Sequence, residues 1–118
     1  MRVLRIAAFW VYSSLAGCIS IWAPGEDPRG LELLRAGDQL VSELQEFRLA
    51  NGSYPSDLEA LHSTVDRGRP GSDFYFAYDR EADSYGLTLH YTPSWPQSGR
   101  VRCARGDDSP GWGCHGYL

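Results

Sequence analysis

The longest regular pattern of apolar positions covers residues 31–50. Apolar side chains recur there every three or four positions, which places them on one face of an α-helix. Gly37 lies within the pattern; it costs about 1 kcal/mol against alanine but lets a strand approach the helix closely. Asn51-Gly52 ends the helix, because both residue types tolerate the left-handed conformation of a C-cap. The apolar face comprises Leu33, Leu34, Leu40, Val41, Leu44, Phe47 and Ala50.

A short second helix is predicted after a chain reversal at Tyr54-Pro55. Ser56-Asp57-Leu58-Glu59 has the spacing of a capping box, with Ser56 as N-cap and Glu59 reaching back to its amide. This helix is expected to end near residue 61 or 62, with Leu58 and Leu61 on its buried side. The polar segment 63–72, which contains two glycines and a proline, is expected to form a loop.

Three strands are predicted in the C-terminal half. Residues 73–78 and 85–92 alternate between apolar and polar side chains, and the polar segment 80–84 joins them as a hairpin loop. Residues 100–105 form a third strand with Val101 and Cys103 inward, and 106–118 form an irregular tail. The fold class is therefore α+β, with a three-stranded antiparallel meander packed on the long helix, because an isolated hairpin is marginal in water. Two rows of side chains face the helix: Phe74, Phe76 and Tyr78, and Tyr85, Leu87, Leu89 and Tyr91.

The N-terminus has the pattern of an export signal. Arg2 and Arg5 precede an uncharged, mainly apolar run over residues 6–15, which is typical of a secretory signal peptide. Leu15-Ala16-Gly17-Cys18 then resembles the lipobox of bacterial lipoproteins at all four positions. The resemblance implies cleavage before Cys18 and acylation of its thiol, and Ile19, where an inner-membrane retention signal has aspartate, favours the outer membrane. The alternatives are an ordinary cleaved signal and an uncleaved membrane anchor.

Three cysteines leave one unpaired in an exported protein. With Cys18 assigned to lipid, Cys103 and Cys114 remain to form a disulfide in an oxidising compartment. The rival interpretation makes Cys103, Cys114 and His115 metal ligands, although no CxxC pair stands nearby.

The charged residues limit the partners that the sequence predicts. All eleven basic residues are arginine, against fifteen acids, and no basic face is concentrated enough to indicate nucleic acid. Cleavage before Cys18 would leave 101 residues with a formal charge of −6. The expected domains are a signal peptide (1–17), a lipidated N-terminus and tether (18–29) and one globular domain (30–118), facing the periplasm from the outer membrane.

The central segment suggests a family resemblance. A helix running into Gly52-Ser53-Tyr54-Pro55-Ser56-Asp57-Leu58-Glu59-Ala60-Leu61 and then an antiparallel meander resembles the pseudopilins of type II secretion, and type IV pilins more broadly. The likeness covers residues 31–92 and implies the globular head of that fold. The pilin processing signal and polymerising apolar helix are absent from this pattern, and the lipobox stands in their place. The resemblance therefore implies a pilin-like head mounted on a lipid.

No sequence motif indicates catalysis. None of the usual metalloprotease, hydrolase or nucleotide-binding motifs occurs, and His62, His90 and His115 lack metal-ligand spacing. Asp107 and Asp108 faintly resemble the calcium loop of major pseudopilins, but two aspartates supply too few ligands, and an exposed turn is the alternative. We therefore expect neither an enzyme nor a resident cofactor, metal or small-molecule substrate.

Trp95 and Trp112 lie in proline- and glycine-rich segments. They either fill gaps in a thin core or anchor a protein contact. The expected function is a membrane-tethered, non-catalytic interaction module, accessory to a secretion or pilus-type system. The alternatives are a structural envelope lipoprotein unrelated to secretion and an uncleaved, membrane-anchored pseudopilin subunit.

Overall fold

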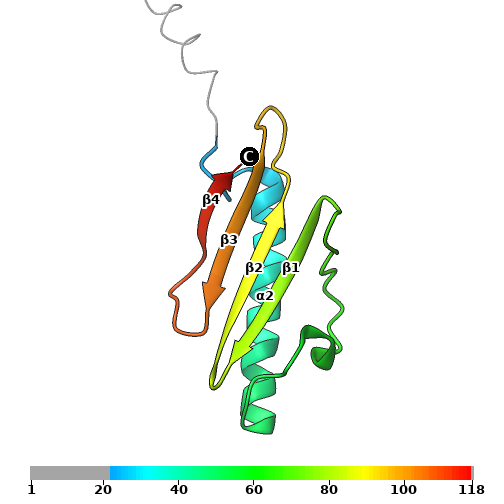
Figure 1. The fold of residues 1–118 in the computed structure, drawn as a ribbon, viewed down its shortest axis with the longest axis vertical. Helices are drawn as coiled ribbons and strands as arrows, with labels where there is room; N and C mark the ends of the chain where they lie inside the picture. The colour runs from blue at the N-terminus through cyan, green and yellow to red at the C-terminus, as the bar shows by residue number, and fades with distance from the viewer. Residues whose placement is uncertain (1–21, 118) are drawn as a thin grey trace, which may run out of the picture.

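A computed structural model describes residues 22–117, which form one long helix packed across one face of an antiparallel sheet (Figure 1). The helix is α2 (Pro28–Asn51), and η2 (Leu58–Leu61) is a single 3₁₀ turn. The sheet contains β1 (Phe74–Glu81), β2 (Ser84–Tyr91), β3 (Arg100–Gly106) and β4 (Gly113–Tyr117), in the order β1-β2-β3-β4. The α+β class and the meander are confirmed, and the expected number of three strands is wrong.

The fourth strand lies where an irregular tail was expected. β4 pairs with β3 in a register that sets Cys103 opposite Cys114 and Arg102 opposite His115. Two of its five residues are glycine, and none of its side chains is fully buried. Such a strand has little intrinsic preference for extended structure and no apolar alternation, so the residue pattern gave no signal. Pairing with β3 is what makes it a strand.

The long helix begins earlier than the apolar pattern indicated. Asp27 is its N-cap, with the carboxylate accepting from the N–H of Gly30, and Pro28 occupies the first turn. Proline is favoured there because its missing N–H would have no partner inside the helix. At the other end Gly52 is left-handed, with φ 83°, and its N–H bonds to the carbonyl of Arg48, so the predicted stop is confirmed.

The expected second helix is only one turn long, and its cap is a different residue. Asp57, and not Ser56, is the N-cap: its carboxylate accepts from the N–H of Ala60 at 3.0 Å. His62 ends the turn in the left-handed region. The segment is held by its neighbours: the Tyr78 hydroxyl donates to the carbonyl of Pro55 at 2.6 Å, and Arg80 donates to that of Tyr54 at 3.0 Å.

The first hairpin is tighter than expected. Both strands continue into the segment assigned to the loop, so that Glu81 pairs with Ser84 and only Ala82 and Asp83 form the turn. The expected faces are confirmed, since the register sets Phe76 opposite Leu89 and Tyr78 opposite Leu87.

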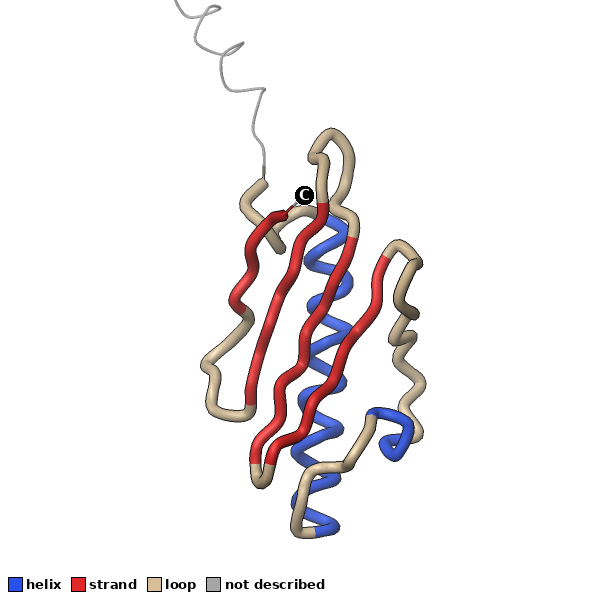
Figure 2. Tube along the Cα trace, in the orientation of Figure 1, coloured by secondary structure: helices blue, strands red, loops and turns tan. Residues whose placement is uncertain are grey.

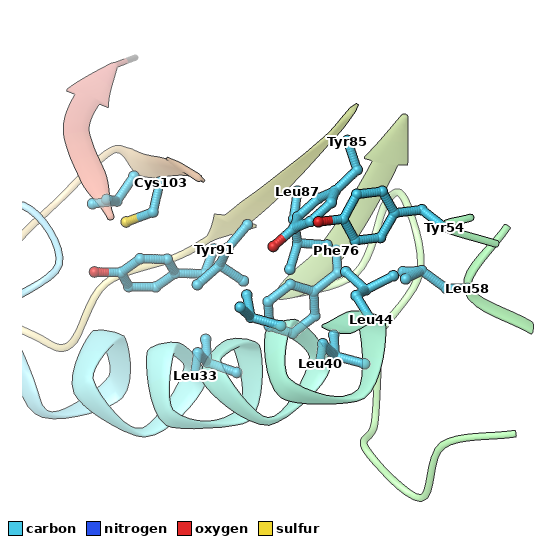
Figure 3. Close-up of a cluster of buried hydrophobic side chains, with 13 residues drawn as sticks. Leu33, Leu40, Leu44, Tyr54, Leu58, Phe76, Tyr85, Leu87, Tyr91 and Cys103 are labelled. Atoms are coloured by element: carbon cyan, nitrogen blue, oxygen red, sulfur yellow. The ribbon is translucent and has the colours of Figure 1, made fainter. Parts of the chain in front are cut away.

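One hydrophobic core joins the helix, the sheet and the Tyr54 segment (Figure 3). Its centre is fully buried, and the Tyr54 and Tyr85 rings meet edge to face with centroids 4.8 Å apart. The buried members are Leu33, Leu40, Val41, Leu44, Tyr54, Leu58, Phe76, Tyr85, Leu87, Leu89, Tyr91, Val101 and Cys103. Most of the predicted inward positions are among them.

Gly37 allows an indole to reach the helix. A Cβ at this position would lie 2.6 Å from Cζ2 of Trp112 and 3.2 Å from Cε1 of Phe76. The close approach predicted at Gly37 therefore involves a tryptophan side chain beside the start of β4. The Trp112 Nε1–H also donates to Asp38 at 2.8 Å, which fixes the ring.

Replacing Gly37 with alanine is expected to destabilise the domain, although alanine is the better helix former. The overlap with Trp112 outweighs the propensity gain of about 1 kcal/mol and leaves a net loss of roughly 1 kcal/mol in the free energy of unfolding. In a Trp112→Ala background the overlap with the indole is gone and Phe76, at 3.2 Å, has to shift by only a few tenths of an ångström, so Gly37→Ala should then be stabilising. Urea denaturation of the four variants measures this change of sign, and the same sign in both backgrounds would contradict the packing.

Candidate functional site

The buried carboxylate of Asp27 organises the end of the domain at which the described chain begins. Its side chain is fully buried. Besides capping α2, it accepts from the Tyr91 hydroxyl at 2.5 Å, from the N–H of Ser94 at 2.9 Å and from the Ser94 hydroxyl at 3.1 Å. These partners come from the last residue of β2 and from the loop that follows it. One carboxylate therefore joins the helix start, the sheet and the β2–β3 loop.

Hydrogen bonds keep this carboxylate charged. Burial alone would raise the pKa of Asp27, but the bonds from Tyr91, from the N–H groups of Ser94 and Gly30 and from the Ser94 hydroxyl together bring the pKa below its ordinary value. The pKa of Tyr91 is raised, by burial first and then by its bond to Asp27. The pair is thus an ionised acceptor with a protonated donor. Asp27 and Tyr91 are both fully buried, and their bond joins the start of the helix to the end of β2.

Gly25 and Asp27, just before the helix, are packed into the domain. The N–H of Gly25 donates to the Tyr91 hydroxyl at 3.1 Å, and Gly25 has φ 85°. A Cβ there would lie 2.6 Å from Sγ of Cys114. The structure therefore places Gly25 and Asp27 inside the domain, within the segment expected to be a tether.

The Cys103–Cys114 disulfide expected from the sequence is confirmed. It links directly paired residues of β3 and β4, with Cα atoms 4.0 Å apart. Because Cys114 Sγ lies against Gly25, the bridge also supports the packed N-terminal segment.

The β2–β3 loop, residues 92–99, is clamped to the start of the chain. The N–H of Arg29 donates to Ser94 Oγ at 3.1 Å, and Gln97 Nε2 donates to the carbonyl of Trp22 at 3.0 Å. The loop carries Trp95, which is 88% exposed. The β2–β3 loop lies at the end of the sheet near which the described chain begins (Figures 1 and 2).

The two tryptophans singled out in the sequence have different surroundings. Trp95 projects from its loop, whereas Trp112 is partly buried between Gly37 and Asp38. Asp38 also pairs with Arg105 at 3.2 Å. Trp112 is therefore used within the domain, and of the two only Trp95 offers its ring to another molecule.

Asp107 and Asp108 belong to the turn after β3. Asp107 Oδ1 accepts from the N–H of Tyr85 at 3.4 Å, and Ser109 bonds back to Gly106. Within residues 22–117, no group of three or more histidine, cysteine, aspartate or glutamate side chains is placed to hold a metal ion. Asp107 thus joins the turn after β3 to the start of β2.

The outer face of the sheet is not covered by the helix. The pairing registers align Tyr75, His90, Arg102 and His115 in one row across the four strands. Tyr75 and His90 stack with centroids 4.6 Å apart, and His90 Nδ1 lies 3.1 Å from the hydroxyl of Tyr117. Burial, followed by Arg102 and Arg100, lowers the pKa of His90, which favours a neutral ring. This row forms an aromatic and cationic surface.

Cys18 lies outside the described residues, as do the whole signal peptide and the first part of the tether. No helix within residues 22–117 is long and apolar enough to cross a membrane. In comparisons with known proteins, the chain matches no family model, no curated protein and no solved structure. No matching protein therefore suggests a function for the site.

Proposed function

We propose that this chain is a lipid-anchored protein of a bacterial cell envelope, attached through Cys18, whose domain is a non-catalytic interaction module. The observation that carries the proposal is the short distance along the chain between the lipobox cysteine and the packed domain. Trp22 follows Cys18 by four residues and already touches Gln97. A lipid on Cys18 would therefore hold one defined end of the domain at the membrane.

The disulfide supports an exported location. Bridges of this kind persist in oxidising compartments such as the periplasm and are rare in the cytosol. Cys103 and Cys114 form the bridge, so that among the three cysteines only Cys18 is left for acylation.

The distribution of charge supports a domain that projects from the membrane. Five carboxylates lie at the opposite end from Trp22, in or beside the β1–β2 and β3–β4 turns: Asp79, Glu81, Asp83, Asp107 and Asp108. Anionic lipid headgroups disfavour contact with these turns, although the exposed Glu26 and Glu32 also lie at the Trp22 end and Arg80 and Arg105 lie near the acidic turns. The acidic end and the uncovered sheet face then remain available to a protein partner.

We further propose that the partner belongs to a secretion or pilus-type apparatus. This step rests on the resemblance to pseudopilin heads. Its support is the order of elements: a long helix, a Tyr-Pro segment whose Tyr54 is buried in the core, and an antiparallel meander packed on the helix. Fold likeness does not fix function, so co-purification with secretion components is the test that separates this role from a general envelope role.

Substitution of Cys18 tests the lipid anchor. Cys18→Ser is expected to remain unprocessed and to lose the acyl mass, because only a thiol accepts the lipid; Ser20→Ala, two positions on, should be processed like the wild type. Radiolabelled palmitate incorporation and gel mobility of the membrane fraction measure both effects. Equal labelling and mobility of Cys18→Ser and the wild type would contradict the proposal.

A further inference from the structure

Exposed apolar side chains gather at one end of the domain. Five large hydrophobic residues in the described chain are exposed, and four of them lie at the end marked by Trp22. Leu31 is in the first turn of α2, Trp95 is in the β2–β3 loop, and Tyr117 pairs with Arg100 at the start of β3. Leu49 alone lies at the other end, in the last turn of α2. Because the Tyr117 hydroxyl lies 3.1 Å from His90 Nδ1 on the uncovered sheet face, only Trp22, Leu31 and Trp95 are called the apolar rim.

The loop that carries Trp95 is held in place by specific bonds. Ser94, directly before it, bonds to the buried Asp27 and accepts from Arg29, and Gln97, two residues after it, donates to the Trp22 carbonyl. A loop fixed on both sides of an indole that is 88% exposed pays no large ordering cost when that indole binds. The bonds of Ser94 and Gln97 thus hold the exposed Trp95 ring in a fixed position at the surface.

The short segment between Cys18 and Trp22 indicates what the apolar rim faces. Trp22 is four positions after Cys18, and a fully extended chain spans at most about 3.6 Å per residue, so a lipid-bearing Cys18 lies at most roughly 14 Å from Trp22. Within that reach lies the boundary between headgroups and acyl chains, where tryptophan and tyrosine rings are favoured. Arg100, which donates to Thr92 Oγ1 at 3.5 Å, places a positive charge at the base of the same loop.

We propose that the apolar rim is a membrane-docking surface and that Trp95 inserts into the headgroup–acyl boundary of the bilayer to which Cys18 is anchored. The inference rests on the proposed lipid anchor and adds a second contact, which fixes the orientation of the domain. The lipid fixes only the chain end at Cys18, and an inserted indole adds a contact that orients the domain. The acidic turns at the opposite end then point away from the bilayer.

The test uses the mature protein extracted from membranes, reconstituted into phosphatidylethanolamine–phosphatidylglycerol vesicles with or without brominated acyl chains, which quench nearby indoles. The readout is the tryptophan emission lost per mole of protein in brominated vesicles. Trp95→Ala is expected to remove roughly half of this quenched emission, since Trp95 and Trp22 are the two indoles of the rim. Trp112→Phe and Leu49→Ala, the latter at a position with the same 88% exposure at the opposite end, should leave it unchanged.

Two further measurements make each outcome decisive. Because Trp95 is exposed, Trp95→Ala should keep the wild-type melting temperature, so that lost quenching reflects the membrane contact. If quenched emission is unchanged in Trp95→Ala while intact mass shows an acylated Cys18, the docking surface is refuted and the lipid anchor stands. If intact mass shows no acylation, the anchor itself is refuted and the docking inference with it.

Discussion

Replacing Asp27 with alanine is expected to lower the free energy of unfolding by about 3 kcal/mol. The change removes the N-cap of α2, worth about 1 kcal/mol, and leaves the buried Tyr91 hydroxyl and the Ser94 N–H without their acceptor, at about 1–3 kcal/mol. For a domain of this size the melting temperature should fall by roughly 15 °C. Thermal and urea denaturation measure the effect.

Asp57→Ala is the matched control. Asp57 also caps a helical turn through its carboxylate, but it is exposed and bonds only to Ala60. Its loss should cost less than about 1 kcal/mol. Equal effects of the two substitutions would show that Asp27 acts only as a cap, and would contradict its role in joining the loop to the helix.

The pH dependence of stability provides an independent check on Asp27. Its pKa is lower in the folded protein than the ordinary value of 3.8, so the folded state favours the ionised form. The contribution is fully present above the unfolded pKa and is lost as pH falls through the folded one. The stability difference between wild type and Asp27→Ala should therefore be constant near neutral pH and shrink below about pH 4.

Loss of the Cys103–Cys114 bridge is expected to destabilise the domain by a similar amount. The cysteines are 11 residues apart, and closing so short a loop contributes about 3 kcal/mol in the chain-entropy model. Denaturation with and without a thiol reductant, with free thiols counted after each run, measures the difference. The melting temperature should fall on reduction, and the packing of Gly25 against Cys114 should loosen with it.

The double variant Cys103→Ala/Cys114→Ala is the control for this prediction. It should melt near the temperature of the reduced wild type and should be indifferent to reductant. A reduced wild type that melts at the same temperature as the oxidised protein would show that β4 is held by strand pairing alone.

The sequence predicted the elements whose apolar residues are regularly spaced. The helical repeat of α2, the alternation in β1 and β2 and the inward Val101 and Cys103 all follow from burial on one face, and all are confirmed. β4 was missed because Gly113 and Gly116 leave no such alternation. The short second helix ends where it was predicted, near residue 61, but it is a 3₁₀ turn capped by Asp57 and not by Ser56.

The site was less predictable because its organising residue acts over a long sequence separation. Asp27-Pro28 has the pattern of an N-cap followed by proline at the first helical position, and this local signal was available. That the same carboxylate would meet Tyr91 and Ser94, more than sixty residues later, is set by the packing of the sheet on the helix. Likewise the sequence offered Trp95 and Trp112 as equivalent, and only the packing of Trp112 on Gly37 separates them.

The central claim is that Cys18 carries the lipid that holds the Trp22 end of the domain at the membrane. The intact mass of the wild-type protein extracted from the membrane fraction tests it most directly. We predict a chain of 101 residues that begins at Cys18 and carries additional acyl mass. A mass equal to that of the unmodified 118-residue chain would contradict the lipid anchor and favour an uncleaved membrane subunit.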